Sequence, residues 1–490
     1  MSVEPRRAIR FYLNDNLVEL DRLEPDRTLL DFLRLDRALR GTKEGCAEGD
    51  CGACTVLIGR KSDDNVRYAP ANACIVLVSM LDGAHVVSIE HLKGRDGALH
   101  PVQQAMVDTH GSQCGFCTPG FVMSLYALWL TRPDPSVAEI ETALQGNLCR
   151  CTGYAPIVRA AQAASRYGSA SEDALNAGRA AMAARLDALC DGRRVVVAGE
   201  RGLSIVPADV DDLAAVLEEM PEATIVAGAT DVGLWVTKFM RDIAPVVLVG
   251  HLLEEIAVAD GRIVFGAGVS YRRAFETIAA HIPQMGELFN RIGGAQVRAM
   301  GTIGGNIANG SPIGDTPPPL IALGAEITLR KGGARRVVRL EDFFIAYGKQ
   351  DREKGEFVES VAVPLPGPED LFGVYKVTKR RDEDITATLG AFRVRLADGA
   401  VAEAVIAYGG MAATPKRAGA VEAALVGRPW TLESVEMAME RFGEDFQPLS
   451  DWRASAEYRM LAAKNLLKRF YIESVEGPSR IVRHEMAEGG

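Results

Sequence analysis

Apolar and polar residues alternate near the start of the chain. Ile9, Phe11 and Leu13 share one face of an extended segment, and Val18 and Leu20 resume the alternation after a turn. A period of two is typical of a strand with one buried face, so this stretch predicts a β-hairpin. Further elements expected in residues 1–90 are a short helix capped by Thr28 and running to Leu33, and strands at 55–58 and 85–89. These residues therefore predict a small α+β domain.

The pattern changes to a helical period between residues 100 and 165. Helices are expected to begin at Pro101, Thr118, Val137 and Pro156, where a proline or a capping residue precedes regularly spaced apolar positions. The second helix is apolar on most of its faces and is expected to be buried. Four helices with short connections predict an antiparallel bundle whose first and third connections lie at the same end.

The rest of the chain predicts two larger mixed units. Residues 166–190 are rich in Ala, Ser and Gly and poor in large apolar residues, so they are expected to form a linker, part of it helical. Residues 191–368 mix short strands and helices with Gly-rich turns. Residues 369–490 are expected to contain a strand pair around Phe392 and Val405 and to end in helices. No repeat of about 20–50 residues is present, which excludes a repeat architecture.

Composition and charge narrow the class of protein. The chain has 490 residues, of which 48% are hydrophobic, and a net charge of −10 with no long basic run, which disfavours nucleic-acid binding. Residues 1–10 lack the apolar core of a signal peptide, and the most apolar helical run, 121–130, is about half the length that spans a bilayer. A cytoplasmic protein is expected. Thiols stay reduced there, so clustered cysteines predict metal ligands rather than disulfides.

Eight of the nine cysteines lie before residue 152. The first set is Cys46, Cys51, Cys54 and Cys74, with four, two and nineteen residues between successive cysteines. This is the plant-type ferredoxin spacing for one [2Fe–2S] cluster. Glycines between the first three cysteines allow a tight loop whose N–H groups turn toward the sulfurs. Four-cysteine zinc is a minor alternative for this set.

The second set is Cys114, Cys117, Cys149 and Cys151. One pair lies in the first connection of the predicted bundle and the other pair in the third, so both are expected to converge on one metal centre. Cys117 precedes a helix N-terminus, where the helix dipole favours a thiolate. Structural zinc is a stronger alternative for this set taken alone. The ninth cysteine, Cys190, is expected to be an inert thiol.

Two Gly-rich turns in residues 191–368 are candidate phosphate sites. Residues 224–231 form a buried-strand pattern that runs into small residues, and 302–306 and 311–315 form a second such region. Small residues let the backbone approach a pyrophosphate, and the hydroxyls of Thr230 and Thr302 add possible donors. No Rossmann fingerprint is present, and ordinary turns remain the alternative. The histidines show no metal-ligand spacing, and no nucleophile–base pattern is found.

Several of these segments resemble the xanthine dehydrogenase/oxidase family. Residues 45–54, 113–121 and 147–154 resemble its two iron–sulfur signatures, 302–315 its FAD segment, and 408–411 part of its flavin-side C-terminal domain. The resemblance implies a multidomain α+β fold. Its expected parts are a β-grasp ferredoxin-like domain at 1–90, a four-helix [2Fe–2S] bundle at 91–165, an α+β FAD-binding domain of the PCMH type at 191–368, and an α+β C-terminal domain at 369–490.

The resemblance also implies a function. Electrons from a molybdenum centre would pass through two [2Fe–2S] clusters to FAD and then to NAD, in oxidation of hypoxanthine and xanthine to urate. This chain would be the electron-transfer subunit and would need a large molybdopterin-binding subunit, in a heterotetramer of two small and two large chains. The alternatives are the same role in a hydroxylase of aldehydes or N-heterocycles, and a zinc-stabilised scaffold without redox function.

The FAD-binding residues implied by the resemblance come from several segments. They are Ile225, Val226, Ala227, Gly228, Ala229, Thr230, Asp231, Val232, Ile292, Gly301, Thr302, Ala308, Asp315, Val358 and Lys376. Relatives often carry Gly or Asn where this chain has Ala229. Residues 379–384 resemble a charged loop beside the flavin that influences NAD access, and a solvated surface loop is the alternative. No catalytic residue for purine hydroxylation is expected in this chain.

Overall fold

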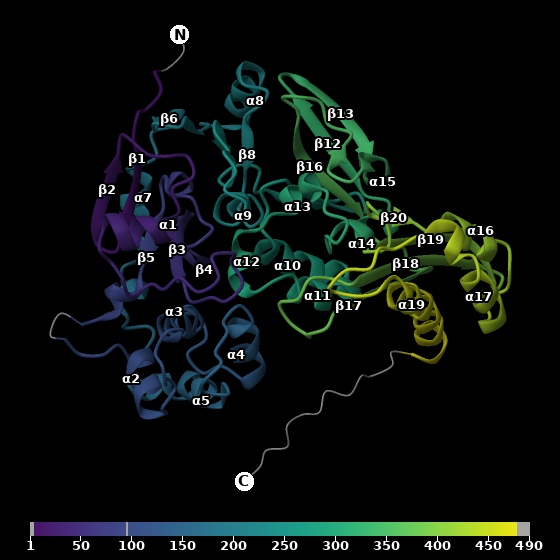
Figure 1. Ribbon diagram of the computed structural model, residues 1–490, viewed down its shortest axis with the longest axis horizontal. Helices are drawn as coiled ribbons and strands as arrows, with labels where there is room; N and C mark the ends of the chain where they lie inside the picture. The colour runs from purple at the N-terminus through teal and green to yellow at the C-terminus, as the bar shows by residue number, and fades with distance from the viewer. Residues whose placement is uncertain (1–3, 95–96, 478–490) are drawn as a thin grey trace.

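The computed structural model describes residues 4–94 and 97–477. The chain forms four successive units, of which the first and second lie one above the other at the left, the third in the middle and the fourth at the right (Figure 1). None of the helices in these described ranges is both long and apolar enough to cross a membrane.

The first unit is a five-stranded sheet in the order β2-β1-β5-β3-β4. Its strands are β1 (Ile9–Leu13), β2 (Asn16–Leu20), β3 (Thr55–Ser62), β4 (Asn65–Asn72) and β5 (His85–Val87). The β1–β2 hairpin is confirmed, and Thr28 caps α1 (Leu29–Asp31), which continues as a π-helical turn at Phe32–Asp36. The strand predicted at 85–89 is shorter than expected, because β5 ends at Val87 and a 3-10 helix follows at Ile89–Leu92. Another 3-10 helix, Val78–Leu81, precedes β5.

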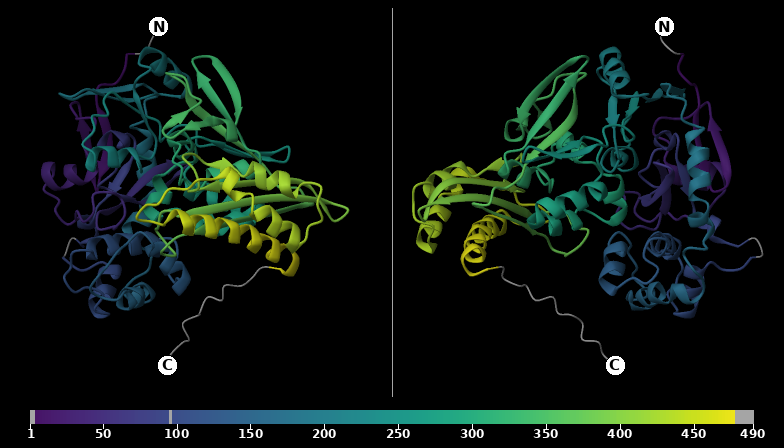
Figure 2. Two further views of the ribbon diagram at one scale, coloured as in Figure 1. Left: turned by 45° about the vertical axis from the view of Figure 1, so that its right-hand side comes forward. Right: turned by 180° about the vertical axis from the view of Figure 1, so that it is seen from behind.

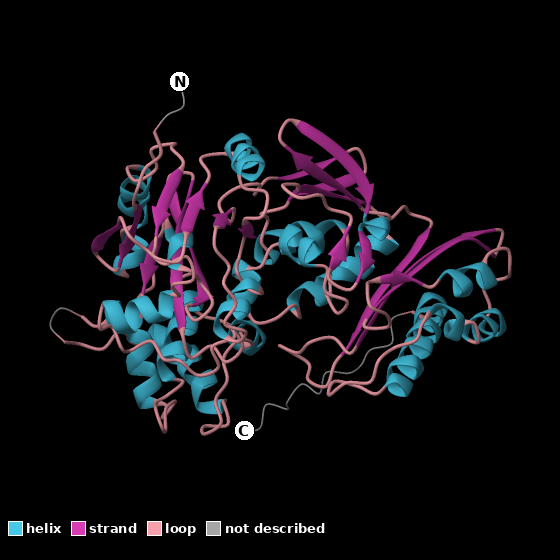
Figure 3. Cartoon of the chain, turned by 45° about the horizontal axis from the view of Figure 1, so that its top comes forward, coloured by secondary structure: helices cyan, strands magenta, loops and turns pink. Residues whose placement is uncertain are grey.

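The four predicted helices of the second unit are confirmed. They are α2 (Pro101–Asp108), α3 (Thr118–Trp129), α4 (Val137–Leu144) and α5 (Ala155–Ala163), and a 3-10 turn follows at Ala164–Arg166. Ser136 and Glu139 form the expected capping box, and α3 is buried on most of its faces. The helices pack together as a group directly below the strands of the first unit (Figure 3).

The segment expected to be a linker is folded against the first two units. It contains α6 (Ala174–Ala177) and α7 (Arg179–Asp187), and α7 packs on β3 and β4. Leu175, Met182 and Leu186 are buried in the core of the helical unit. The segment has few large apolar residues, but their helical spacing places them on one face, which is enough to dock it.

The third unit consists of two sheets joined by helices. The first sheet has the order β6-β7-β9-β8, and its strands are β6 (Val195–Ala198), β7 (Leu203–Val206), β8 (Thr224–Val226) and β9 (Val246–Leu248). The second has the order β10-β11-β16-β12-β13, with β10 (Ile256–Ala259), β11 (Arg262–Gly266), β12 (Glu326–Lys331), β13 (Ala334–Arg339) and β16 (Phe357–Pro364). A small pair, β14 (Phe344–Ala346) and β15 (Lys349–Gln350), lies between β13 and β16 in sequence.

The helices of the third unit connect these strands. They are α8 (Val210–Glu219), α9 (Val232–Thr237), α10 (Tyr271–His281), a 3-10 turn at Pro283–Met285, α11 (Gly286–Asn290), α12 (Ala295–Met300), α13 (Ile303–Asn309), α14 (Pro317–Ala322) and α15 (Leu340–Phe343). The first sheet shares one continuous apolar core with the first unit, in which Val226 and Leu248 pack with Phe11 and Cys74. The first and third units are therefore joined through a common core.

The fourth unit is a four-stranded sheet covered by helices. Its strands are β17 (Asp370–Val377), β18 (Thr388–Ala397), β19 (Ala400–Gly409) and β20 (Lys416–Arg417), and its helices are α16 (Gly419–Leu425), α17 (Leu432–Met439), α18 (Phe442–Asp445) and α19 (Ala456–Glu476). The predicted strand pair is confirmed, with Phe392 opposite Ile406. The long helix α19 lies along one face of the sheet (Figure 2), where Phe470 stacks on Phe392.

Candidate iron–sulfur and flavin sites

The first cysteine set converges beneath the loop between α1 and β3. Cys54 and Cys74 are buried, and Cys46 and Cys51 are partly exposed. The Cys46 sulfur makes hydrogen-bonding contacts with the thiols of Cys51 and Cys74, and Cys74 also contacts Cys54. The backbone N–H of Cys51 donates to the Cys46 sulfur at 3.3 Å. The structure therefore brings all four cysteines of this set together.

Charge in this set is concentrated on one sulfur. Contact with the Cys51 thiol, and then with the Cys74 thiol, lowers the pKa of Cys46 well below the usual thiol range, and N–H groups of Cys51 and Glu48 act in the same direction. The pKa values of Cys51 and Cys74 are raised by the same contacts with Cys46. A thiolate is the form of cysteine that binds metal, so the loop favours this form at Cys46, whereas Cys51 and Cys74 would lose a proton when they bind metal.

The second cysteine set converges between the first and third connections of the helical unit, as the bundle predicted. Cys117 contacts the thiol of Cys149, and Cys114 contacts that of Cys151. The Cys149 sulfur also lies 3.2 Å from the Thr152 hydroxyl. Cys114 and Cys151 are exposed, so this site lies at the surface of the described chain.

The expected thiolate preference of Cys117 is wrong. Cys117 does occupy the position before α3, but its side chain makes no capping hydrogen bond. Burial, and then contact with Cys149, raises the pKa of Cys117 to about 12. At Cys149 burial acts in the same direction, but hydrogen bonds from Thr152 and Cys151 outweigh it and lower the pKa. Burial therefore outweighs the helix dipole at Cys117, and the partner sulfur is the more acidic.

The two cysteine sets are linked by a direct backbone hydrogen bond. The N–H of Leu148, the residue before Cys149, donates to the carbonyl oxygen of Cys51 at 3.0 Å. The Asn147 amide donates to the Gly52 carbonyl at 3.2 Å. These contacts hold the residues flanking one site against those flanking the other.

A buried glutamine from the third unit completes this junction. Gln296, on α12, is 1% exposed. Its amide lies 3.0 Å from both Thr55 Oγ1 and Asn147 Oδ1, and 3.3 Å from Ser124 Oγ. One side chain of the third unit thus meets residues of the first and second units. Sequence reasoning missed it, because nothing local distinguishes this glutamine from a surface one.

The two Gly-rich turns of the third unit meet at Gly228. A Cβ there would lie 1.8 Å from the carbonyl oxygen of Met300, so only glycine fits this crossing. Gly301 lies next to Thr230, whose Oγ1 would be 3.2 Å from a Cβ at that glycine. The structure therefore brings the residues expected from both turns, Ile225 to Val232 and Gly301 to Thr302, into one region.

The two turns differ in the N–H groups that they offer. In the second turn the amides of Ile303 and Gly304 donate to Val269 and Ala267 carbonyls, and Gly305 donates to Thr302 Oγ1. In the first turn the amides of Ala229, Thr230 and Asp231 donate to no acceptor within the described residues. Successive unpartnered amides form a nest for an anion, so the first turn is the better candidate for a pyrophosphate.

Ala229 has a left-handed backbone conformation in this turn. Its φ is +56°, a value that an alanine adopts with strain and that Gly or Asn adopts more readily. A left-handed residue is a usual part of a backbone nest, so alanine with this conformation is compatible with an anion site at the turn.

The remaining expected flavin residues lie around the second sheet and the fourth unit. Lys376 forms a buried ion pair with Asp315 at 2.6 Å, and its Nζ also donates to the carbonyl of Arg291, the residue before Ile292. Thr386, which was not predicted, donates to the other Asp315 oxygen. Ile292 and Val358 are almost fully buried in the core of the second sheet, and Ala308 packs against that core.

A buried amide oxygen lies among these residues. Asn306 Oδ1 has no hydrogen-bond partner among the described residues, and it faces the small residue Gly314. An orphaned acceptor next to glycine indicates space and bonding capacity for a ligand. Together with the nest at Ala229–Asp231, it shows that the residues present fit a flavin nucleotide. Asn306 was part of the Gly-Gly-Asn turn but was not among the expected contacts.

The charged loop at residues 379–384 is only partly solvated. Lys379, Arg380 and Arg381 are exposed, whereas Glu383 is buried and neither of its carboxylate oxygens has a hydrogen-bond partner among the described residues. Burial, and then the nearby charge of Asp50, raises the pKa of Glu383 to about 9. The loop therefore exposes its basic residues to solvent but buries Glu383, so it is not simply a solvated surface loop.

The candidate flavin turn is directly connected to the first cysteine loop. The turn continues into α9, whose Thr237 Oγ1 donates to the carbonyl of Ala47 at 2.7 Å. The next residue, Lys238, donates to the carbonyl of Cys46 at 2.5 Å. A Cβ at Gly233 would lie 2.7 Å from Ile75, which follows Cys74. The first turn of the flavin site and the first cysteine site are thus held together by one short helix.

The donor sets fit iron–sulfur clusters in number and chemistry. Each set supplies four cysteine sulfurs, the complement that one [2Fe–2S] cluster takes. Within residues 4–94 and 97–477, no three His, Cys, Asp or Glu side chains are arranged to hold a single metal ion. The fit therefore rests on the donors and their convergence.

Four family models match successive parts of the chain. They are described as a 2Fe-2S iron-sulfur cluster binding domain at residues 11–79, a [2Fe-2S] binding domain at 88–162, an FAD binding domain in molybdopterin dehydrogenase at 200–366, and a CO dehydrogenase flavoprotein C-terminal domain at 373–474. The multidomain α+β fold expected from the sequence is confirmed by these matches and by the observed units.

Curated relatives match nearly the whole chain. The xanthine dehydrogenase/oxidase of Rattus norvegicus is 30% identical over 97% of this chain, and xanthine dehydrogenase 1 of Arabidopsis thaliana is 33% identical over 89%. The chain spans about 40% of the length of the first relative and 37% of the second.

Solved structures match about half of the chain. Carbon monoxide dehydrogenase from Hydrogenophaga pseudoflava is 27% identical with a TM-score of 0.51, and the match covers 54% of this chain and 93% of that one. Quinoline 2-oxidoreductase from Pseudomonas putida 86 is 25% identical with a TM-score of 0.51, covering 56% and 96%. The matches define a chain with two [2Fe–2S]-binding domains and an FAD-binding domain. The chain belongs to the molybdenum hydroxylase family and comprises its iron–sulfur and FAD-containing portion.

Proposed function

We propose that this chain is the electron-transfer subunit of an NAD-dependent xanthine dehydrogenase. The observation that carries the proposal is the contact chain from the second cysteine set to the first and on to the flavin turn. It runs through the Leu148–Cys51 hydrogen bond and then through the contacts of Thr237 and Lys238 with the first cysteine loop. Such continuity is what stepwise electron transfer between cofactors needs.

Named residues would hold each cofactor. Cys46, Cys51, Cys54 and Cys74 would bind one cluster, and Cys114, Cys117, Cys149 and Cys151 the other. Ile225 to Val232 with Gly301, Thr302, Ala308 and Asp315 would bind FAD, with Ile292, Val358 and Lys376 near its ring. When bound, the clusters would carry single electrons and FAD would collect two of them for hydride transfer to NAD.

The chain's own residues position and insulate these groups. The amides of Ala229–Asp231 would bind the pyrophosphate, and the Asp315–Lys376 pair would orient the flavin end of the site. The buried contacts of Gln296 and Asn147 exclude water from the junction between the cysteine sets. Purine hydroxylation would lie on a molybdenum-binding partner subunit, with two chains of each kind in the assembly, in the cytoplasm.

Paramagnetic resonance of the dithionite-reduced protein tests the cofactor assignment. Two distinct [2Fe–2S] signals are expected in the unmodified protein. Cys149→Ser should remove one signal and leave FAD bound, because Cys149 contacts Cys117, Thr152 and Tyr154, which are not among the residues proposed to bind FAD. Cys190→Ser is the matched control, since this cysteine belongs to neither set, and it should keep both signals. Zinc in place of iron, with no signal after reduction, would contradict the assignment.

A turnover assay tests the substrate and the partner. The chain alone should not reduce NAD with xanthine, and the complex with its molybdenum subunit should. Parallel assays with an aldehyde and with quinoline test the sister activities, because a quinoline 2-oxidoreductase is among the similar structures. Turnover of xanthine by the isolated chain would contradict the placement of purine hydroxylation on a partner subunit. A preference of the complex for another substrate class would contradict the xanthine assignment.

A further inference from the structure

A cavity of about 200 Å³ lies between the first and third units, away from both cysteine sets. Its charged lining residues are Arg60, Lys61, Arg67, Arg272, Arg273, Asp82 and Glu254. Five cationic side chains therefore face two anionic ones, although the whole chain has a net charge of −10. One wall is shared with the flavin turns through Ala227, Gly228 and Thr302.

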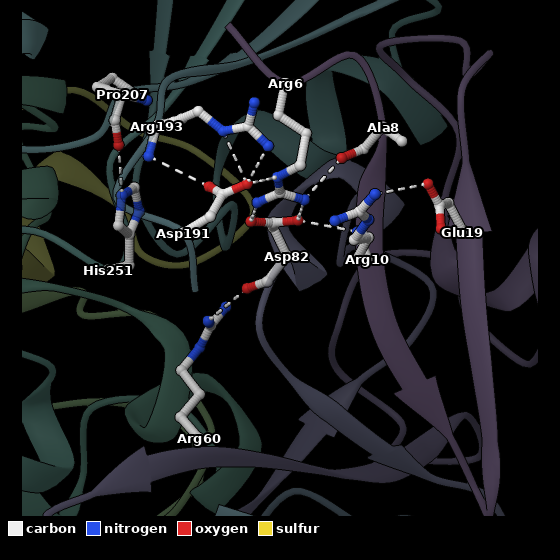
Figure 4. A network of polar contacts seen from close by, with 10 residues as sticks. All are labelled: Arg6, Ala8, Arg10, Glu19, Arg60, Asp82, Asp191, Arg193, Pro207 and His251. Atoms are coloured by element: carbon white, nitrogen blue, oxygen red, sulfur yellow. Dashed lines mark hydrogen bonds and ion pairs between the residues drawn. The ribbon is translucent and has the colours of Figure 1, made fainter. Parts of the chain in front are cut away.

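Both acidic residues of the cavity already have cationic partners. Asp82 accepts two hydrogen bonds from Arg6, at 2.8 and 2.7 Å, and Figure 4 shows this carboxylate enclosed by the Arg6 guanidinium and the backbone of Arg10. Glu254 pairs with Arg273 at 3.3 Å. Lys61 is likewise paired with Asp187, outside the cavity. The charges that remain uncompensated are therefore all positive.

Three arginines of the cavity have no carboxylate partner in the described part of the chain. Arg60 donates to the carbonyl oxygens of Met80 and Asp82, at 2.5 and 3.4 Å, and the latter contact is visible in Figure 4. Arg67 donates only to a serine hydroxyl, and Arg272 only to the Tyr68 carbonyl. Neutral acceptors satisfy part of each guanidinium without neutralising it.

Arg67 lies close to both of the other two arginines in this set. Arg60 and Arg67 lie directly opposite each other in the antiparallel β3–β4 pair, an arrangement that destabilises a sheet when both residues carry the same charge. Desolvation, and then the charge of Arg67, lowers the pKa of Arg272. Burial also lowers the pKa of Arg60. The fold keeps three cations around one cavity at a cost that a bound anion would remove.

Uncharged groups of the lining also have bonding capacity left. The Ser79 hydroxyl is buried and has no hydrogen-bond partner among the described residues. His251 donates from Nε2 to the Pro207 carbonyl at 2.8 Å, as Figure 4 shows, so Nδ1 of the neutral ring can accept a hydrogen bond from a protonated phosphate oxygen. A hydroxyl beside guanidinium groups is a typical donor to the unprotonated oxygens.

We propose that this cavity binds a small phosphate-type anion, either free phosphate or the phosphate group of an ester. Guanidinium groups pair with phosphate through two parallel hydrogen bonds, which matches the arginine lining. The volume is below the range of about 300–1,000 Å³ typical of sites for larger ligands, which favours a small anion over a whole dinucleotide. The walls come from two units, so the anion would strengthen their contact. This site is additional to the proposed electron-transfer function.

Thermal unfolding of the flavin-loaded protein, titrated with inorganic phosphate at constant ionic strength, tests the proposal. Loaded protein is used because an empty flavin site would also take phosphate, and visible flavin absorbance reports whether FAD stays bound. A saturable rise in the unfolding midpoint is expected with phosphate and not with chloride. Arg67→Gln and Arg272→Gln should each raise the half-saturating concentration about tenfold or more.

Arg428→Gln is the matched control, because Arg428 is exposed on the fourth unit and has no ion pair among the described residues. It should leave the phosphate response unchanged. Adenosine monophosphate, tested in the same way, distinguishes an ester from the free anion, and either response supports the site if both arginine variants weaken it. The absence of a saturable shift, or a shift that both variants retain, would overturn the proposal.

Discussion

Gly52 is the residue of the first cysteine loop with the least room for a side chain. Its φ is +67°, and a Cβ would lie 2.1 Å from the Gly146 carbonyl oxygen of the second unit. Alanine at this position costs about 1–2 kcal/mol for the backbone conformation and about 1–3 kcal/mol more for the forced contact. Gly52→Ala should therefore lower the thermal stability of the chain and its iron content per flavin.

Gly399→Ala provides the matched control for this substitution. Gly399 also has a positive φ, +75°, but a Cβ there would meet nothing within 4 Å. This variant should show the backbone cost alone and retain its iron. Equal losses of iron in the two variants would mean that contact with the second unit does not shape the first cysteine loop.

His85 should make the stability of the first unit depend on pH. Its Nδ1 accepts from the Tyr68 hydroxyl at 2.7 Å and its Nε2 donates to the Asn14 carbonyl, so the neutral ring fits its site. Burial lowers the pKa of His85 to about 4. Between that value and the unfolded pKa of about 6.5 the unfolded chain binds the extra proton, so stability falls as pH drops through this window.

His85→Gln should remove this component, which amounts to about 3 kcal/mol across the window. Thermal midpoints of the variant and the unmodified protein should differ in their change between about pH 7 and about pH 5. The exposed His281→Gln is the control and should change with pH as the unmodified protein does. An identical pH response in the His85 variant would show that the buried ring does not contribute.

At the scale of elements, α12 of the third unit contacts both the first and the second unit through Gln296. Gln296→Leu keeps the approximate volume of the side chain but removes the amide that reaches Thr55, Ser124 and Asn147. Loss of buried hydrogen bonds of this kind costs about 1–3 kcal/mol. Hydrogen exchange of the α12 amides should become faster, because the helix loses its anchor.

Gln104→Leu is a suitable control for the α12 variant. Gln104 makes its side-chain hydrogen bond within α2, to Asp108, so its loss changes no contact between units. Exchange at α12 should be unaltered in this variant. If Gln296→Leu left exchange at α12 unchanged as well, the docking of the third unit would depend on apolar packing alone.

Elements with local signals were predictable from the sequence, and contacts between distant segments were not. Pro101 and the Ser136 capping box fix helix starts through their neighbours, and cysteine spacing is itself a local pattern. The docking of α7 depends on three apolar side chains finding a core made by other segments. The raised pKa of Cys117 depends on burial, which no spacing reveals.

In the candidate sites, too, local motifs were predictable from the sequence, and contacts between distant segments were not. The cysteines and the Gly-rich turns could be named because each site is built from short motifs. The unpartnered amides of Ala229–Asp231, the Asn306 oxygen and the Gln296 junction depend on which backbone groups already have partners. That information exists only once the two sheets of the third unit are placed against the first unit.

At the scale of the whole molecule, the candidate flavin site joins both sheets of the third unit to the fourth. The turn after β8 belongs to the first sheet, Val358 to the second, and Lys376 to β17. A ligand that binds only the folded arrangement stabilises it by about 2.7 kcal/mol at a hundredfold excess over its dissociation constant. Removal of FAD should lower the unfolding midpoint, and added FAD should restore it in a concentration-dependent way.

Hydrogen exchange in the first sheet, measured with and without FAD, is the internal control for this prediction. Hydrogen exchange in β2 should be the same in both states, because β2 is an edge strand of the first sheet and pairs with β1. Slower exchange throughout the chain on FAD addition would instead indicate a global effect and contradict a ligand confined to the third and fourth units.

The pairing of Arg6 has a consequence for synthesis on the ribosome. Its backbone bonds with Arg194 and Val196, and its guanidinium also contacts Asp191 at 3.2 Å. At roughly 5–20 residues per second, those partners emerge on the order of 10–40 s after Arg6 itself. The segment around Arg6 must therefore remain without these partners during that interval, and it can complete its contacts only after residues 191–196 have been made.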